Sequence, residues 1–278
     1  MKVRILGTRG SLPSTNPDTL RYGGNTSCIE VMDEDQTIIF DAGTGIMNLS
    51  IDKAVAKTRF DILLTHLHID HIQGLGFFKP LFNSKNEIHI WGPASSSRTL
   101  QNRLNRYFSP PLFPVLFRDL PCQKHLHEIS HSTFEIGSLK IDSRFINHPG
   151  PTIGYRITNG KSVFSYLPDH EPFMGDRGWD TEKKWISGIE LAADADLLIH
   201  DSQYTTEEYQ KHVGWGHCSI DQAVRFASIA EVRKLLLFHH DPNHTDNQLD
   251  DILNSFMEDK SYGFEIDLAT EGSIHNIN

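Results

Sequence analysis

Three cysteines, Cys28, Cys122 and Cys218, are all that the 278-residue chain contains, and none lies in CxxC spacing. This odd number argues against a disulfide framework and favours a reducing cytoplasm. Long apolar runs are missing too, since no stretch of about 18 uncharged apolar residues is present that would span a membrane. The start of the chain, MKVRILGTRGS, lacks the cleavage-site pattern of a signal peptide. We therefore expect a cytoplasmic protein with no membrane partner.

Basic residues are outnumbered, with 26 Lys and Arg against 36 Asp and Glu and a formal net charge of −10. This balance disfavours a large nucleic-acid surface, because such a surface needs clustered positive charge to neutralise phosphates. Neither a short-period repeat nor a Ser/Gly-rich linker divides the chain. We expect residues 1–278 to form one domain, which is long enough to bury a substantial core.

Short apolar runs rich in Ile, Leu, Val and Phe are abundant, and their length and their Gly, Pro or Asp flanks predict strands. They cover 2–7, 27–32, 37–41, 61–66, 87–92, 139–148, 152–158, 162–169, 196–201 and 234–240. Helical patterns cover 205–212, 219–232 and 245–259, and Ser219 with Gln222 forms a capping box at the start of the second. Mixed strands and helices predict an α/β or α+β fold with sheets covered by helices.

Six of the predicted strands end in the same way, with an Asp or His directly after the apolar run. These residues are Asp41, His66, His148, Asp169, Asp201 and His239. A single polar residue after a strand is usually only solvated, but six of them, mostly able to bind metal, predict strand ends that meet at one rim. Ligands of α/β proteins bind at such rims.

The segment LLTHLHIDHIQG (63–74) places His66, His68, Asp70 and His71 within six positions. A solvated surface loop is the alternative, but imidazole and carboxylate groups at this spacing suit Zn, Mn or Fe. Four ligands from one loop exceed the three that an open catalytic zinc site keeps. Two metals that share a bridging carboxylate fit better, with His148, Asp169 and a histidine near 239 completing the set. The pattern predicts a binuclear hydrolase centre.

The segment THLHIDH (65–71) resembles the HxHxDH signature of the metallo-β-lactamase superfamily, and the likeness extends over nearly the whole chain. It is most similar to the phosphodiesterase branch, which contains tRNase Z and cyclic phosphodiesterases. Seven further segments resemble motifs of that branch in the same order, although IHDSQY has Asp where the branch has Glu. They are GTRGSLP (7–13), FDAGTG (40–45), HPGPTIGYRI (148–157), YLPD (166–169), IHDSQY (199–204), GHCS (216–219) and LLLFHHDP (235–242).

The resemblance implies an α/β fold, a four-layer αββα sandwich with two divalent metal ions at one edge of its sheets. Zinc is the expected metal, with manganese or iron as alternatives. One ion would be held by His66, His68 and His148, the other by Asp70, His71 and His239, with Asp169 as the bridge. His240 is the alternative to His239, because boundaries read from sequence shift by a residue or two. Homodimers are common in this branch, so a homodimer is expected.

The catalytic residues implied by the resemblance are Asp70, His217 and Asp201. His217 would give a proton to the leaving alkoxide, and Asp201 would orient its imidazole. The alternative for His217 is a residue that only starts the helix beside the Ser219 cap.

The substrate is expected to be a small phosphodiester. tRNase Z carries a long basic arm before its bridging Asp, whereas here only residues 156–168 separate Tyr155 from Asp169. We expect hydrolysis of a cyclic nucleotide (cAMP, cGMP, cCMP or cUMP) by a metal-bridging hydroxide. The alternatives are a phosphoribosyl cyclic phosphodiesterase, a tRNase Z-like RNA endonuclease, and a non-hydrolytic di-iron or degenerate binding member of the superfamily.

Two segments, 106–122 and 170–185, would build a nucleobase pocket from Phe113, Phe117, Phe173 or Trp179. Packing of 106–122 over the core is the alternative.

Overall fold

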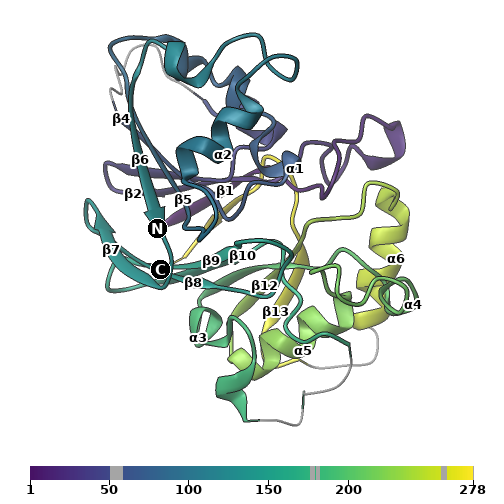
Figure 1. Ribbon diagram of the computed structural model, residues 1–278. Coiled ribbons are helices and arrows are strands. Elements are labelled where there is room, and N and C mark those ends of the chain that lie inside the picture. Colours follow the sequence, from purple (N-terminus) through teal and green to yellow (C-terminus); the bar gives the residue numbers. More distant parts are fainter. Residues whose placement is uncertain (51–58, 176–178, 180–181, 258–261, 278) are drawn as a thin grey trace.

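The computed structural model describes residues 1–50, 59–175, 179, 182–257 and 262–277, and its strands form two seven-stranded sheets (Figure 1). The first sheet has the order β14 (Ile274–Asn276), β1 (Lys2–Gly7), β2 (Cys28–Asp33), β3 (Gln36–Phe40), β4 (Arg59–Leu63), β5 (Glu87–Pro93), β6 (Gln123–Ile129). The second has the order β13 (Glu265–Leu268), β12 (Lys234–Phe238), β11 (Leu197–Asp201), β10 (Val163–Leu167), β9 (Ile153–Thr158), β8 (Leu139–Phe145), β7 (Ser132–Ile136).

Helices cover the outer faces of both sheets (Figure 1). They are α1 (Ile69–Ile72), α2 (Leu100–Tyr107), α3 (Ile189–Ala192), α4 (Thr206–Tyr209), α5 (Ile220–Ala230) and α6 (Asp246–Met257). Phe40 and Tyr155 belong to the core between the sheets, Leu104 to the core under α2, and Phe226 to the core under α5. Helix, sheet, sheet and helix thus form the four layers, which confirms the predicted α/β fold and αββα sandwich. In the part of the chain that is described, every helix is too short or too polar to cross a bilayer.

All ten predicted strands are present, with ends within a few residues of the expected ones. β12 shows why they were recognisable: it is parallel to both neighbours, so Leu235–Phe238 are buried on both faces and read as a continuous apolar run. The capping box is also present, because Ser219 accepts from Gln222 N–H and the Gln222 side chain accepts from Ser219 N–H. The helix predicted at 205–212 is shorter, covering only Thr206–Tyr209.

The prediction that Phe113, Phe117 and Trp179 line a nucleobase pocket is wrong, while residues 176–178 and 180–181 of the second segment lie outside the described residues. Phe113 and Phe117 are buried in the core under α2, and Trp179 is buried in the core under α5. Phe173 packs edge-on against Trp179, with ring centroids 5.1 Å apart. Phe113 and Phe117 therefore follow the alternative given for 106–122, which is packing over the core. Burying each ring removes a large apolar area from water.

Strand direction decides where the functional residues meet. β3, β4, β5 and β6 run parallel to one another, as do β10, β11, β12 and β13. Parallel strands of one sheet present their carboxyl ends at the same edge, so the segments that follow β10, β11 and β12 gather at one edge of the second sheet. The segment that follows β4 of the first sheet meets them there, since Nε2 of His71 lies 3.0 Å from Oδ1 of Asp169.

Candidate metal centre

One group of three histidines lies where the β4–α1 segment meets the loop after β8. His66 follows β4, His68 is the N-cap of α1, and His148 follows β8. Nδ1 of His68 lies 3.1 Å from Nε2 of His148, and one ring nitrogen from each of the three histidines lies within 4.8 Å of the others. These atoms are close enough to be ligands of one ion.

A second group joins both sheets. Asp70 and His71 come from α1, Asp169 follows β10, and His239 follows β12. Nε2 of His71 lies 3.4 Å from Oδ2 of Asp70 and 3.0 Å from Oδ1 of Asp169, and Nε2 of His239 lies 3.2 Å from Oδ2 of Asp70. All four side chains are buried.

Asp169 lies between the two groups. Its Oδ2 is 3.6 Å from Nε2 of His66 and 3.8 Å from Nε2 of His148, on the side of the first group. The same oxygen is 3.4 Å from Nε2 of His239, and Oδ1 faces His71. A carboxylate in this position can contact an ion in either group, which is what a bridging ligand requires.

The donors fit divalent cations. Among the described residues, three buried atoms lack a well-aligned hydrogen bond: Nε2 of His66, Nε2 of His71 and Oδ1 of Asp169. The last two lie 3.0 Å apart, and the carboxylate and imidazole face each other as two ligands of one ion would. Such orphaned groups are costly in a folded protein unless a ligand satisfies them. Five imidazoles and two carboxylates form a donor set that suits zinc, manganese or iron.

Charge at the centre also favours a cation. Burial opposes a proton on His71, but the carboxylates of Asp169, Asp70 and Asp41 raise its pKa well above the usual value. Burial likewise opposes the charge on Asp169, but His239, His71 and His66 lower its pKa well below the usual range. The carboxylates of the centre are therefore ionised, and their negative charge is stabilised by a nearby positive charge such as a metal ion.

Asp41 supports His71 from behind. It is the residue after β3, and its Oδ2 lies 2.8 Å from Nδ1 of His71, which leaves Nε2 to face the ligand groups. Asp41 also accepts hydrogen bonds from the Thr65 N–H at 2.8 Å and the Tyr166 hydroxyl at 3.0 Å. Sequence reasoning placed Asp41 at the rim but gave it no role. Its place directly after an apolar strand was the available signal.

Gly216 and Glu171 fix the position of His148. The Gly216 carbonyl lies 2.8 Å from Nδ1 of His148, and a Cβ on Gly216 would come within 2.4 Å of that atom. With φ of +86°, this position also requires glycine for its backbone conformation. Glu171 is buried and accepts from the N–H groups of Gly214 and Gly216 at 2.9 Å each. Sequence reasoning missed Glu171, since nothing near it in the chain indicates a buried carboxylate.

The structure places His239, and not His240, in the second group. Oε1 of Gln203 lies 3.1 Å from Nδ1 of His239, and this bond orients the ring so that Nε2 faces Asp70. Gly10 leaves the space that the imidazole occupies, because a Cβ there would lie 2.2 Å from Nδ1. The His240 ring points elsewhere, with Nε2 3.0 Å from the carbonyl of Ala269.

His217 and Asp201 form a pair beside both groups. Nδ1 of His217 lies 2.6 Å from Oδ2 of Asp201, and the His217 ring lies 4.9 Å from the rings of His148 and His239, centroid to centroid. The backbone N–H groups of Gln203 and Cys218 fix Asp201 through its Oδ1. Burial lowers the pKa of His217, but the charge and hydrogen bond of Asp201 outweigh it and raise the pKa to about 9. His217 can therefore carry a proton near neutral pH.

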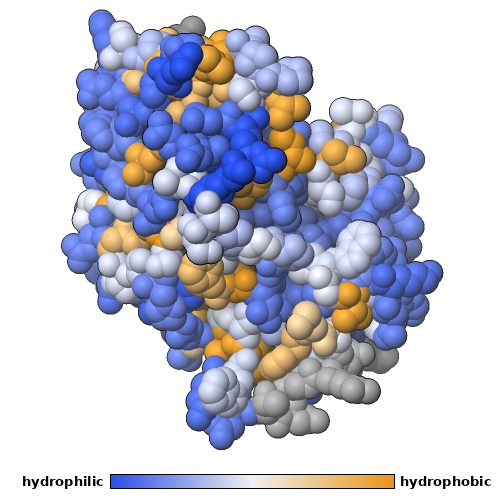
Figure 2. Space-filling model, viewed as in Figure 1, coloured by the Kyte–Doolittle hydropathy of each residue, from blue (hydrophilic) through white to orange (hydrophobic). Residues whose placement is uncertain are grey.

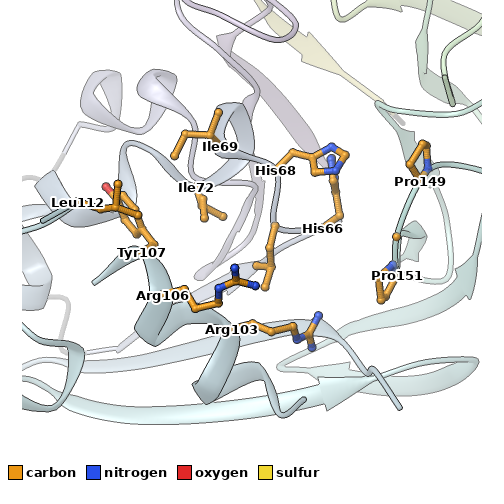
Figure 3. Close-up of a pocket in the computed structure, with 12 residues that line it drawn as sticks. His66, His68, Ile69, Ile72, Arg103, Arg106, Tyr107, Leu112, Pro149 and Pro151 are labelled. Carbon is orange, nitrogen blue, oxygen red and sulfur yellow. The ribbon is translucent and has the colours of Figure 1, made fainter. Parts of the chain in front are cut away.

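A cleft of about 310 Å³ opens beside His66 and His68, with walls from the β4–α1 segment, α2 and residues 149–151. Figure 3 shows Arg103 and Arg106 on one side of this space, with Pro149 and Pro151 on the other. Nε of Arg103 is buried and has no hydrogen-bond partner in the described chain. The space-filling view shows a notch in the molecular surface next to the region of α2, with hydrophobic side chains on the rim of the notch (Figure 2).

The chain is similar to known proteins in both sequence and fold. Residues 36–240 match the family described as Beta-lactamase superfamily domain. Ribonuclease Z of Gemmatimonas aurantiaca is 27% identical, over 85% of this chain and 84% of its own length. The human short-form tRNase Z superimposes with a TM-score of 0.69 at 22% identity and covers all of both chains. A diphosphatase of the PhnP family superimposes with a TM-score of 0.70 at 16% identity, over 100% of this chain and 98% of its own.

The two superpositions support the same fold, and the family match covers most of the chain, including both groups of candidate ligands. Members of this superfamily bind divalent metal ions, and the orphaned donors described above suit such ions. The chain belongs to the β-lactamase superfamily, and it is a metal-dependent hydrolase.

Proposed function

We propose that the protein is a phosphodiesterase with a binuclear metal centre that hydrolyses a small phosphodiester such as a cyclic nucleotide. The observation that carries this proposal is the cleft beside His66 and His68, which is also lined by two arginines, Arg103 and Arg106. Its volume of about 310 Å³ is at the lower end of the range for small-molecule sites. Guanidinium groups match the geometry and charge of phosphate oxygens.

The seven candidate ligands would hold two ions, with Asp169 in contact with both. When bound, such ions polarise a phosphoryl oxygen and make water a stronger nucleophile. Asp70 would orient the attacking water by accepting a hydrogen bond, and its own position is fixed by the Ser11 N–H at 2.8 Å from Oδ2.

His217 would protonate the leaving oxygen. Because Asp201 accepts the Nδ1–H, Nε2 is the atom from which a proton leaves. Asp201 would stabilise the imidazolium before transfer and hold the ring in place during it. The ring lies beside both ligand groups, where a phosphodiester bound between them would present its leaving group.

The short β9–β10 connection supports a small substrate. Thr158 ends β9 and Val163 begins β10, so only four residues, 159–162, connect the two strands. They form a tight turn in which Oδ1 of Asn159 accepts from the N–H groups of Lys161 and Ser162. No arm for a large RNA projects from this turn.

A tRNase Z-like RNA endonuclease is the second candidate, because curated relatives such as the one from Gemmatimonas aurantiaca are named ribonuclease Z. Zinc as the metal and a homodimer as the assembly, both expected from the family likeness, also remain part of the proposal. The first experiment should distinguish between a cyclic nucleotide and phosphoribosyl cyclic phosphate as the substrate.

The test is a substrate panel with the metal-loaded protein and Asp169→Ala as an inactive control. The panel holds 3′,5′-cyclic nucleotides, phosphoribosyl cyclic phosphate, bis-p-nitrophenyl phosphate and a precursor tRNA, each with product analysis. We expect turnover of bis-p-nitrophenyl phosphate and of at least one small cyclic diester. Efficient site-specific 3′ cleavage of the precursor, without turnover of any cyclic diester, would replace the first candidate by the second.

A further inference from the structure

A second set of imidazoles, with one carboxylate, lies on strands β5 and β6. Glu87 and His89 are two residues apart on β5, and His125 and His127 are two residues apart on β6. Residues at this spacing share one face of a sheet, and the register places His89 directly opposite His125. The four side chains therefore form one cluster on one face.

Three of the polar atoms converge. Oε1 of Glu87 lies 2.7 Å from Nε2 of His89 and 3.3 Å from Nε2 of His125, and all three atoms lie within 4.8 Å of one another. Tetrahedral zinc with bonds of 2.0–2.1 Å places its ligand atoms about 3.3 Å apart. The side chains of Glu87 and His125 are 40% and 44% exposed and free to rotate that far, whereas the His89 side chain is only 11% exposed.

His127 lies where it can orient the ring of His89. Its Nε2 lies 2.9 Å from Nδ1 of His89, the nitrogen that does not face Glu87. Its ring stacks on Trp91 at a centroid distance of 3.8 Å, which fixes the acceptor. Ligating histidines in proteins commonly give their second N–H to such a partner.

This cluster is separate from the candidate metal centre. His89 pairs with Asp61 in β4, and His66 comes five residues later, beyond the carboxyl end of that strand. At about 3.3 Å per residue the two places are roughly 15 Å apart along the sheet. Asp61 itself is engaged by Arg59 through two contacts of 2.9 Å. β6 is the edge strand of its sheet, and Figure 1 shows it running toward β7.

We propose that Glu87, His89 and His125 bind a divalent cation, with water completing the coordination and His127 orienting His89. Two imidazole nitrogens and one carboxylate oxygen suit Zn²⁺, Ni²⁺ or Cu²⁺. The ion replaces the proton that His89 and Glu87 share, and this proton passes to solvent. Since the ligands come from both β5 and the edge strand β6, the ion holds the edge strand in register.

The experiment compares bound zinc in the wild type and in matched variants, after dialysis of the purified full chain against micromolar Zn²⁺ and metal analysis. We expect His125→Ala and Glu87→Gln each to bind one ion fewer per chain than the wild type. His131→Ala, which removes an exposed histidine at the β6–β7 turn outside the cluster, is the control and should keep the full count. His127→Phe keeps a ring on Trp91 but loses the acceptor, and should weaken this ion by about 10–100-fold.

Circular dichroism checks that each variant is folded, and turnover of bis-p-nitrophenyl phosphate separates this site from the catalytic one. Wild-type turnover in His125→Ala, together with the loss of one ion, supports the proposal even if the physiological substrate differs from the one proposed above. An unchanged ion count in both His125→Ala and Glu87→Gln would show a hydrogen-bonded polar cluster only. Loss of the ion together with turnover would assign that ion to the catalytic centre, and would equally overturn the proposal.

Discussion

Asp41 and His71 are joined by a contact of 2.8 Å between Oδ2 and Nδ1, and both side chains are fully buried. The contact fixes the ring so that its other nitrogen, Nε2, faces Asp70 and Asp169. Asp41 is itself held by Thr65 and Tyr166, so the carboxylate cannot turn away without losing these two partners as well as His71. The basicity and direction of a candidate ligand are thus set by a residue outside the ligand set.

Asp41→Asn should weaken metal binding by about 10–100-fold, because a neutral amide no longer stabilises positive charge on the His71 ring. Competition with a chromophoric chelator measures the affinity. Asp142→Asn, on β8, is a matched control that should bind metal as the wild type does. Equal affinity in the wild type and Asp41→Asn would show that the pair serves only the fold.

Asp169→Ala should lower both metal content and turnover. Without this carboxylate, two neighbouring cations lose the negative charge that screens their repulsion. Metal analysis of the folded variant is the measurement, and His68→Ala should likewise deplete at least one ion. Two ions per chain in Asp169→Ala would contradict the bridging role.

His217→Ala should leave metal content intact and lower turnover by roughly 10²–10⁴, the usual range for a positioned proton donor. The loss should be smaller for p-nitrophenolate, which leaves without a proton, than for a ribose alkoxide. Asp201→Asn should show the same pattern more mildly, because only the orienting partner changes. Equal losses on both substrates would indicate positioning instead of proton transfer, and metal loss would make His217 a ligand.

Arg106→Ala should raise KM for a cyclic nucleotide by about tenfold and change kcat little, since the charge-assisted hydrogen bond of an exposed arginine is worth about 1.5 kcal/mol. Steady-state kinetics separate the two constants. Arg98→Ala, an exposed arginine that does not line the cleft, is the control. If both variants have wild-type KM, the cleft does not bind the anionic substrate.

Arg9→Ala should lower the free energy of unfolding by about 3–5 kcal/mol. The Arg9 side chain is completely buried and donates to the carbonyls of Gly23 at 2.8 Å and His244 at 2.8 Å, and it contacts Asp246 at 3.4 Å. Removing it leaves these acceptors without a partner. Chemical denaturation of the metal-free protein measures the effect without a contribution from bound ions, and a loss below about 1 kcal/mol would contradict it.

Sequence reasoning succeeded where burial dictates residue type. Strands buried on both faces, such as β12, need continuous apolar side chains, and residues after such strands stand out as polar. It failed where burial is partial. β6 reads QKHLHEI because one face is polar, and α2 buries only Leu100 and Leu104, so neither has a strong apolar pattern.

The candidate site shows the same limit. HxHxDH places four residues in one loop, so local spacing was enough to find them. Glu171 acts across the fold on Gly214 and Gly216, more than 40 residues away in the chain. Only the three-dimensional structure shows such a contact. Likewise, only the structure shows that Phe113 and Phe117 are buried. Their aromatic character alone did not indicate whether they face the core or the solvent.

The seven candidate ligands are divided between the two sheets, since His66, His68, Asp70 and His71 belong to the β4–α1 segment while His148, Asp169 and His239 follow strands of the second sheet. Bound ions would therefore cross-link the halves of the sandwich, and free metal would enter the folding equilibrium as a ligand of the native state. At a metal concentration 100 times the Kd, a single site adds about 2.7 kcal/mol to the free energy of unfolding. The melting temperature of this protein should thus follow the chelator content of the buffer, and its two sheets should separate more readily in a metal-starved cell.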